Sequence, residues 1–301
     1  MQNVIANSMR PIIKLLLFLF FAQQAWGQDG FIGKSPALAY WTVGNKEEVV
    51  IVLHGGPGAG HQYLRPEWDA LTKVARVVYY DQRGCGKSEK ADCYTWEEHV
   101  EDLKRVITSF SKGRKVILAG SSWGTILALL YAYTYPQDIK AIILSGTVAW
   151  PGQGTALKDC SFYKPDYHKY LALGLDTTLQ YTSMKYNYTI KAPQVPDSAF
   201  FRKVKEDKLY ASPFFERVAT LNSLKDAPTL SALQKIEVPI LIFHSSGKCD
   251  EKHSFLKDAS EQYSILPKVE VFSIDGACHD PWFTNPKTFF AKCIDFLNKL
   301  N

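Results

Sequence analysis

The chain has 301 residues, of which 46% are apolar and 22% charged, and 35 Lys and Arg against 30 Asp and Glu give a formal charge of +5. This apolar fraction is ordinary for a globular protein and excludes a wholly disordered or collagen-like chain. The charge is small, and basic residues are interleaved with acidic ones without a run of five or more. We therefore expect no nucleic-acid partner.

The first 27 residues have the pattern of a secretory signal. Arg10 and Lys14 are their only charges, an apolar stretch covers 15–22, and small residues precede a cleavage point after Gly27. The apolar stretch is much shorter than the about 20 residues that a membrane-spanning helix needs. We expect the signal to be removed, which predicts an exported protein, periplasmic or secreted, without stable membrane insertion.

Beyond this segment, runs of β-branched and aromatic residues alternate with stretches of helical apolar spacing. The predicted strands cover 37–43, 48–54, 76–81, 115–120, 141–145, 239–245 and 269–274. The predicted helices cover 96–110, 123–135, 251–263 and 286–300, the first with Thr95 as its N-cap. This alternation predicts an α/β fold, a mostly parallel central sheet with helices on both faces.

The stretch 148–235 interrupts the alternation. It is rich in Tyr, Lys, Asp and Pro and contains short amphipathic segments at 167–173, 200–209 and 213–221, without a convincing strand. Its many Phe, Tyr and Leu residues argue against a long disordered loop. We expect a helical insertion between two strands of the sheet.

The segment Gly120–Gly124 (Gly-Ser-Ser-Trp-Gly) fits the pattern G-x-S-x-G. The pattern alone is weak, but here it lies between a predicted buried strand and a predicted helix. A sharp turn at that point would lift Ser122 out of the sheet, and glycines are needed where the backbone is strained and closely packed. The sequence therefore predicts Ser122 as a catalytic nucleophile.

A serine nucleophile needs a base and a group that orients the base. Asp250 follows the predicted strand 239–245, and His279 follows the predicted strand 269–274. Both residues thus lie just past the carboxyl ends of strands, where open α/β sheets place their sites. We predict His279 as the base and Asp250 as the acid. Rival carboxylates nearby in the sequence are Asp258, Asp275 and Asp280.

Acyl transfer also needs N–H donors aimed at the developing oxyanion. One is expected from the backbone of Trp123, the residue after the nucleophile. The second is expected from the loop His54–Gly58, where glycines let the backbone approach closely. Gly56 is the first choice for this donor. Gly55 is the second choice and a candidate substrate contact.

Several segments together resemble an α/β-hydrolase of the prolyl iminopeptidase type. They are His54–Gly58, Asp81–Ser88, Thr95–Trp96, Gly120–Gly124 and Gly276–His279. The Asp-Gln-Arg-Gly-Cys-Gly-Lys-Ser run is the most specific, because it separates that family from generic esterases. The similarity covers roughly 37–147 and 236–299. It implies a Ser-His-Asp triad, no metal or other cofactor, a helical cap over the site, and release of an N-terminal proline.

The signal pattern and the resemblance together divide the chain into a signal peptide (1–27), a hydrolase core (28–147 and 236–301) and a cap (148–235).

The cap departs from the family pattern. Caps of that family carry a Trp-rich segment leading into a Glu, and acidic cap residues hold the free amine of the substrate. Here no Trp follows Trp150 in the insertion. Glu216 and Glu206 are candidate substrate-binding acids, although Arg217 could already pair with Glu216. A buried amine needs an opposing carboxylate. Without one, aminopeptidase activity should be poor while ester hydrolysis could persist.

In an exported protein, cysteines are candidates for disulfides. Cys249 and Cys278 directly precede Asp250 and His279, so a disulfide between them could brace the acid and the base; two buried thiols are the alternative. Cys85–Cys93 is a weaker candidate, because Cys85 is expected to be a small packed residue. None of the six cysteines forms a Cys-x-x-Cys pair, which argues against a zinc site.

Together these patterns predict an exported serine hydrolase that acts through an acyl-enzyme on a small molecule or a short peptide. A prolyl iminopeptidase-like aminopeptidase and a carboxylesterase or amidase both stay open. From a different class, a catalytically weak ligand-binding protein also stays open, because fold alone does not fix function. The sequence predicts no particular oligomeric state.

Overall fold

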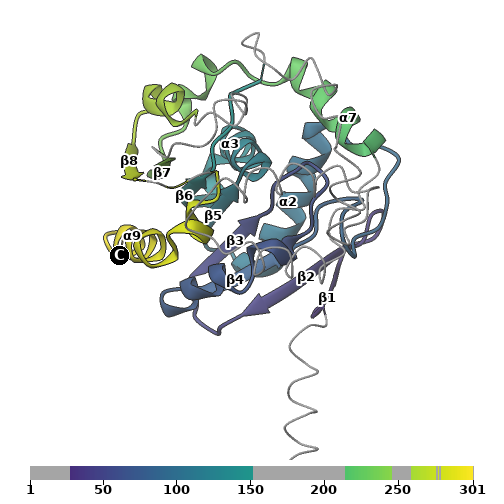
Figure 1. The fold of residues 1–301 in the computed structure, drawn as a ribbon. Helices are drawn as coiled ribbons and strands as arrows, with labels where there is room; N and C mark the ends of the chain where they lie inside the picture. Colours follow the sequence, from purple (N-terminus) through teal and green to yellow (C-terminus); the bar gives the residue numbers. More distant parts are fainter. Residues whose placement is uncertain (1–27, 152–213, 246–258, 276, 278, 301) are drawn as a thin grey trace, which may run out of the picture.

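The computed structural model describes residues 28–151, 214–245, 259–275, 277 and 279–300, which Figure 1 draws in colour. Their strands are β1 (Gly30–Ile32), β2 (Leu38–Val43), β3 (Val49–Leu53), β4 (Arg76–Tyr80), β5 (Val116–Ser121), β6 (Ile139–Ser145), β7 (Ile240–Ser245) and β8 (Val269–Ile274). They form an eight-stranded sheet in the order β1-β2-β4-β3-β5-β6-β7-β8. β2 pairs antiparallel with both β1 and β4, and the other pairs are parallel. The predicted mostly parallel sheet is confirmed.

The α-helices of the described residues are α2 (Trp96–Ser111), α3 (Trp123–Thr134), α7 (Phe214–Ser223), α8 (Pro281–Thr284) and α9 (Pro286–Asn298). Short 3-10 helices connect them: η2 (His61–Leu64), η3 (Glu67–Lys73), η4 (Pro136–Asp138), η6 (Leu224–Asp226), η7 (Ser231–Lys235) and η9 (Ser260–Ile265). α2 and α3 lie together over the middle of the sheet, and α9 lies apart from them (Figure 1).

The two faces of the sheet carry separate layers of the core, as the central strand β3 shows. Val49, Ile51 and Leu53 belong to the apolar cluster that also contains residues of α2 and α3. Val50 and Val52 belong to a second cluster with η3, α8 and α9. Successive side chains of a strand point to opposite faces, so an all-apolar strand requires cover on both sides. The helices supply that cover.

The start of α2 is capped differently from the prediction. Thr95 has the extended backbone of an N-cap, with φ −71° and ψ 160°, but its side chain makes no capping hydrogen bond. The first free N–H of the helix, that of Trp96, instead donates to Oγ of Ser223 at 2.9 Å. Ser223 closes α7, so a residue of the insertion caps a helix of the core.

The prediction of a helix over 251–263 is wrong at its C-terminal end, the part that the structure describes, because residues 260–265 form the 3-10 helix η9. Leu266 is extended, with φ −73° and ψ 143°. It precedes Pro267, and a residue before proline is disfavoured in the helical region, which limits the segment to a short turn. Residues 251–258 lie outside the described part. β1, η3 and α8 were not predicted from the sequence.

The weaker disulfide candidate is wrong, since Cys85 and Cys93 are both free thiols. Cys85 is buried, and its thiol hydrogen bonds to the carbonyl oxygen of Arg83 within the same turn, whereas Cys93 is exposed. Cys85 is thus the small packed residue that was expected. Cys249 and Cys278 lie outside the described residues.

The described part of the insertion packs on the core at both ends. Trp150 at its start is 1% exposed, and its backbone N–H donates to Oε1 of Gln262 in η9 at 2.8 Å. Thr220 of α7 is buried against α2, where its hydroxyl lies 3.2 Å from Nε2 of His99. No helix within the described ranges is long and apolar enough to span a membrane.

Candidate active site

Ser122 stands at the sharp turn between β5 and α3, with φ 56° and ψ −121°. A positive φ is strained for a residue with a side chain and persists only where the surrounding structure enforces it. A Cβ on Gly120 would lie 2.4 Å from the carbonyl oxygen of Gly124, and a Cβ on Gly124 would lie 2.2 Å from that of Leu53. Packing therefore requires both glycines, and the turn places Ser122 at the N-terminus of α3.

The backbone of Ser122 is held from both sides. Its N–H donates to the carbonyl oxygen of Ser145 at the end of β6, at 3.1 Å. Its carbonyl oxygen accepts hydrogen bonds from the N–H of Thr125 at 2.8 Å and from its hydroxyl at 2.6 Å. The Ser122 side chain is half-buried and does not cap α3, although it faces the positive end of the helix dipole. This position suits a group that becomes negatively charged.

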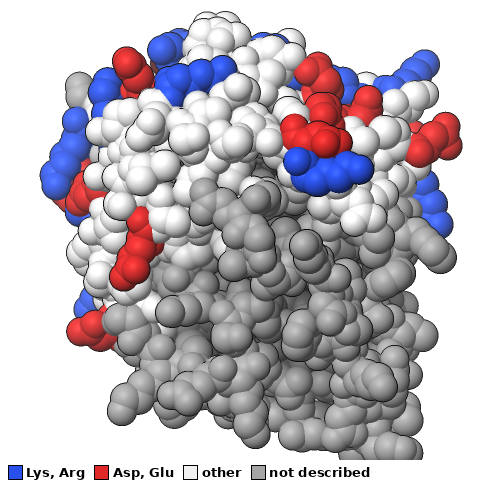
Figure 2. Space-filling view, turned by 90° about the horizontal axis from the view of Figure 1, so that it is seen from above, with Lys and Arg blue, Asp and Glu red and all other residues white. Residues whose placement is uncertain are grey.

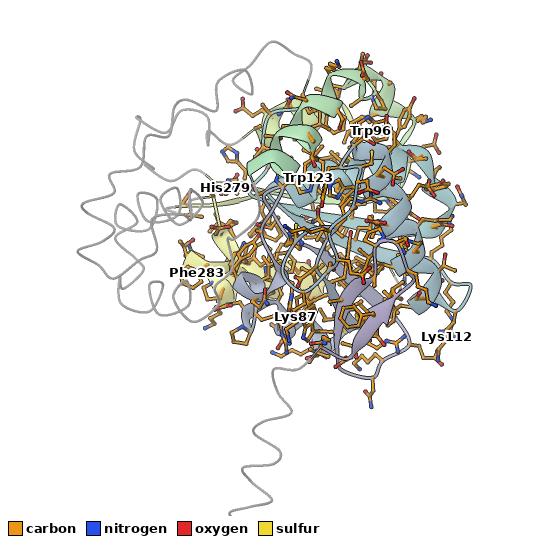
Figure 3. The ribbon with its side chains drawn as sticks, turned by 90° about the vertical axis from the view of Figure 1, so that its right-hand side faces the viewer. Lys87, Trp96, Lys112, Trp123, His279 and Phe283 are labelled. Atoms are coloured by element: carbon orange, nitrogen blue, oxygen red, sulfur yellow. The ribbon has the colours of Figure 1, made fainter. Side chains whose placement is uncertain are left out.

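His279 lies against the same end of β6. A Cβ on Gly146, which follows Ser145 and has φ +58°, would lie 2.2 Å from the carbonyl oxygen of His279 and 3.3 Å from its ring carbon Cε1. Only glycine fits at this position. Figure 3 shows His279 and Trp123 in the same region of the molecule. The fold thus brings the predicted base to the strand end that holds the backbone of Ser122.

The other predicted site residues are placed only in part. Asp250 and Glu206 lie outside the described residues, and so does the side chain of Glu216, which belongs to α7. Among the rivals of Asp250, Asp258 is also outside, and Asp280 is buried directly after His279. The identity of the orienting carboxylate stays a prediction.

The loop after β3 carries the two glycines predicted as donors. The N–H of Gly55 donates to the hydroxyl of Tyr63 at 2.7 Å, and a Cβ on Gly55 would lie 3.0 Å from Cβ of Ser122. Gly55 thus contacts Ser122, but its N–H is already engaged. Gly56 has φ +127°, a conformation that favours glycine. Gly56 stays the predicted donor beside Trp123, whose N–H opens α3.

His54 fixes the orientation of this loop. Its Nε2 accepts a hydrogen bond from the N–H of Gln82 at 2.9 Å, so the ring proton is on Nδ1, which donates to the carbonyl oxygen of Gly55 at 2.9 Å. Burial lowers the pKa of His54 to about 4, and the imidazole is neutral at pH 7. The carbonyl of Gly55 and the N–H of Gly56 share one planar trans peptide and point in opposite directions. Consequently the N–H of Gly56 points away from the His54 ring.

Asp81 holds the other end of the loop. Its Oδ1 accepts hydrogen bonds from the backbone N–H and from Nδ1 of His61, each at 2.9 Å, and its Oδ2 accepts from the N–H of Lys87 at 2.8 Å. Burial alone would raise the pKa of Asp81. The hydrogen bond from His61 and the electrostatic attraction of that imidazole outweigh burial, and together they hold the pKa of Asp81 below its usual value. A Cβ on Gly86 would lie 2.0 Å from Oδ2, so this glycine leaves room for the carboxylate.

Arg83 fastens the same segment to α2. The guanidinium is 4% exposed and binds Asp102 through two parallel hydrogen bonds, Nε to Oδ2 at 2.8 Å and Nη2 to Oδ1 at 2.9 Å. It also donates to the carbonyl oxygens of Cys93 at 2.6 Å and Glu98 at 3.0 Å. In the sequence alone, the run 81–88 is recognisable only as a family signature. The structure shows that its buried charges position the loop of Gly56.

Charged side chains on the surface are not clustered by sign. Figure 2 shows basic and acidic side chains interspersed on a largely uncharged surface, without a field of one sign on the described part of that face. Within the ranges that the structure describes, no three His, Cys, Asp or Glu side chains are grouped so as to hold a metal ion.

Comparison with known proteins places this arrangement in a family. A family model described as the alpha/beta hydrolase fold matches residues 48–167. The chain is 32% identical to the proline iminopeptidase of Lactobacillus delbrueckii subsp. bulgaricus over 276 residues, which cover 82% of this chain and 89% of that protein. It is 37% identical to the proline iminopeptidase of Thermoplasma volcanium over 124 residues, which cover 40% of this chain but only 42% of that protein.

Solved structures show the same fold. The esterase from Exiguobacterium antarcticum superposes with a TM-score of 0.67 at 20% identity, covering 89% of this chain and 99% of the esterase. At this identity the likeness concerns the fold alone. The match to the Lactobacillus delbrueckii enzyme covers most of both proteins. The chain belongs to the proline iminopeptidase family of α/β hydrolases.

Proposed function

We propose that the protein is a serine hydrolase that releases an N-terminal residue, proline above all, from small peptides through an acyl-enzyme on Ser122. The observation that carries the proposal is the strained turn at Ser122, enforced by Gly120 and Gly124, with His279 against the neighbouring strand end. Strained backbone at the start of a helix is a common feature of nucleophilic serines in this fold.

The proposed reaction uses groups at the ends of β3, β5 and β8. His279 accepts the proton of the Ser122 hydroxyl while Oγ attacks the carbonyl carbon, and the oxygen that becomes negative accepts hydrogen bonds from the N–H groups of Gly56 and Trp123. His279 then gives the proton to the leaving amine, the C–N bond breaks, and the acyl-enzyme remains. A water molecule attacks the ester, His279 takes its proton, and Ser122 recovers a proton as the acid leaves. Asp250 orients His279.

The choice of substrate rests on the relatives. The two described above are named proline iminopeptidases, and the longer match covers most of both chains. The shorter match covers less than half of its relative. Release of N-terminal proline is therefore proposed for this chain from the longer match together with the site.

A second candidate, hydrolysis of small esters or amides without a free amine, is favoured by the insertion. Trp150 is its only tryptophan within 148–235, and this side chain is buried with its indole N–H bonded to Pro228. It is therefore not free to line a substrate pocket. Glu206 and Glu216 remain the candidate amine anchors for the first function.

Kinetics with matched substrates tests both candidates. Purified protein is assayed with proline 4-nitroanilide, N-acetylproline 4-nitroanilide and 4-nitrophenyl acetate, beside the Ser122→Ala variant. Aminopeptidase function predicts turnover of the first and loss of at least about 100-fold in kcat/KM on acetylation, since a buried ammonium–carboxylate contact would be lost. Equal turnover of the two anilides, with faster ester cleavage, would favour the second candidate. If the Ser122→Ala variant still turned over all three substrates, that result would contradict both candidate functions.

We also propose export, because residues 1–27 have the sequence pattern of a secretory signal. Expression in the native host followed by amino-terminal sequencing is the direct test. The proposal expects a mature chain beginning at Gln28 outside the cytoplasm. An intact amino terminus in the cytoplasmic fraction would contradict it.

A further inference from the structure

The side chain of Gln82 connects the two segments that carry the proposed oxyanion donors. Its Oε1 accepts the indole N–H of Trp123 at 2.8 Å, and its Nε2 donates to the carbonyl oxygen of His54 at 2.9 Å. An indole N–H only donates and a carbonyl oxygen only accepts, so the chemistry of the partners fixes the orientation of the amide. Gln82 is 1% exposed, and water does not compete for these bonds.

The position of Gln82 itself is fixed by its neighbours in the chain. Its backbone N–H binds the ring of His54. The residue before it, Asp81, binds His61 at the other end of the Gly56 loop, and the residue after it, Arg83, binds Asp102 of α2. The amide is thus carried on a backbone that buried hydrogen bonds hold on both sides.

We propose that Gln82 is a positioning residue of the oxyanion hole, which holds the Gly56 loop and Trp123 at the separation where both N–H groups reach one oxygen. This inference rests on the proposed function. Donors in an oxyanion hole act at about 2.7–3.1 Å from the oxygen, so a shift of either segment weakens the bond that forms in the transition state. Binding of the substrate itself depends little on that bond.

The test compares Gln82→Met with Gln82→Glu. Methionine keeps the length of the side chain but removes both hydrogen bonds. We expect kcat to fall about 10- to 100-fold with KM changed less than about twofold, a smaller loss than deletion of a donor causes. Phenylboronic acid, which forms a tetrahedral adduct on an active serine, should bind more weakly by the same factor as kcat falls. A purely structural role would not move these two readouts together.

Glutamate supplies a rescue that depends on pH. When protonated, its carboxyl group can accept from the Trp123 indole and donate to the His54 carbonyl; when ionised, it repels that carbonyl oxygen. The kcat of Gln82→Glu relative to wild type should therefore rise as pH falls, whereas the ratio for Gln82→Met should stay flat. Tyr131→Phe is the matched control, because Tyr131 lies on α3, the helix that Trp123 begins, and the variant removes a partly buried hydrogen bond of 2.6 Å to Asp138. Its kcat should equal that of wild type.

The outcomes separate this inference from the proposed function. If wild type is labelled at Ser122 by a fluorophosphonate while Gln82→Met keeps full kcat and boronate affinity, the inference is overturned and the function stands. If wild type shows neither labelling nor turnover, both are overturned. Should Gln82→Met fail to fold, Trp123→Phe removes one of the same hydrogen bonds from the other side and keeps the backbone N–H. Unchanged kcat in Trp123→Phe and in Gln82→Glu at every pH would then overturn the inference.

Discussion

The backbone N–H of Ser122 donates to the carbonyl oxygen of Ser145 at 3.1 Å, from the turn after β5 to the end of β6. Ser121 and Ser145 are register partners in the two strands, so this bond continues the ladder by one residue into the turn. Gly146 comes next and contacts His279. The relationship makes the end of β6 the common support of the proposed nucleophile and the proposed base.

Substitution of Gly146 should therefore damage activity more than stability. In Gly146→Ala the new Cβ would collide with the carbonyl oxygen of His279 at 2.2 Å, and the histidine must shift. We predict a loss of about 100-fold in kcat, the cost of displacing a catalytic group by about 1 Å. Gly113→Ala is the control, since it has φ +78° but no atom within 4 Å of the new Cβ. It should cost about 1 kcal/mol of strain and leave kcat unchanged. Equal kcat in the two variants would contradict the support role of β6.

The Arg83–Asp102 pair should contribute more to stability than an exposed pair of the same kind. Lysine cannot form the two parallel hydrogen bonds that Arg83 makes, so in Arg83→Lys the buried Asp102 should depend on its other partner, Arg105, which donates to Oδ1 at 2.6 Å. We predict a loss of about 2–4 kcal/mol in the free energy of unfolding, measured by urea denaturation.

The matched control is Arg114→Lys, whose partner pair Arg114–Glu47 is 60% and 80% exposed. Water and salt screen such exposed pairs, so this variant should unfold like wild type. An equal loss in the free energy of unfolding in the two variants would show that burial of Arg83 does not determine how much the pair contributes to stability.

His99 should make the stability of the protein depend on pH. It is buried against Trp123 and Thr220, and burial lowers its pKa to about 3. The unfolded chain binds a proton at His99 below its ordinary pKa of about 6.5, while the folded chain does not. The contribution of His99 is thus fully present above about pH 6.5 and is lost as pH falls toward about 3.

The variant His99→Gln isolates this effect, because every other titrating group is retained. Wild-type stability should fall more steeply than that of the variant between pH 6 and pH 4, by about 1.4 kcal/mol per pH unit. Urea denaturation at several pH values measures the two slopes. Parallel slopes would mean that His99 accepts a proton in the folded protein over this range.

The sequence predicted the features that depend on local patterns. The strands around Ser122, the helix after it and the two glycines beside it follow from apolar runs and from one five-residue motif. Contacts between distant residues were not predictable in this way. Gln82 and Trp123 are 41 residues apart, and the hydroxyl of Ser223 that caps α2 is 127 residues from Trp96.

The buried charges show the same limit. Asp81 and Arg83 are residue types that are common in exposed turns. Their burial depends on distant partners such as His61 and Asp102, which are 20 and 19 residues away in the sequence. Thr95 likewise had the residue type of an N-cap, but tertiary packing supplied a better-placed hydroxyl. The assignment of Asp250 remains a prediction from chain order alone.

Covalent labelling of two adjacent serines tests the central claim most directly. Ser122 is half-buried at the strained turn, whereas Ser121 beside it is fully buried. Wild type and Ser121→Ala, treated with a fluorophosphonate and digested, should each carry one adduct on Ser122 by peptide mass spectrometry, and Ser122→Ala should carry none. An adduct on another residue, or no adduct on folded wild-type protein, would contradict the assignment of Ser122 as the nucleophile.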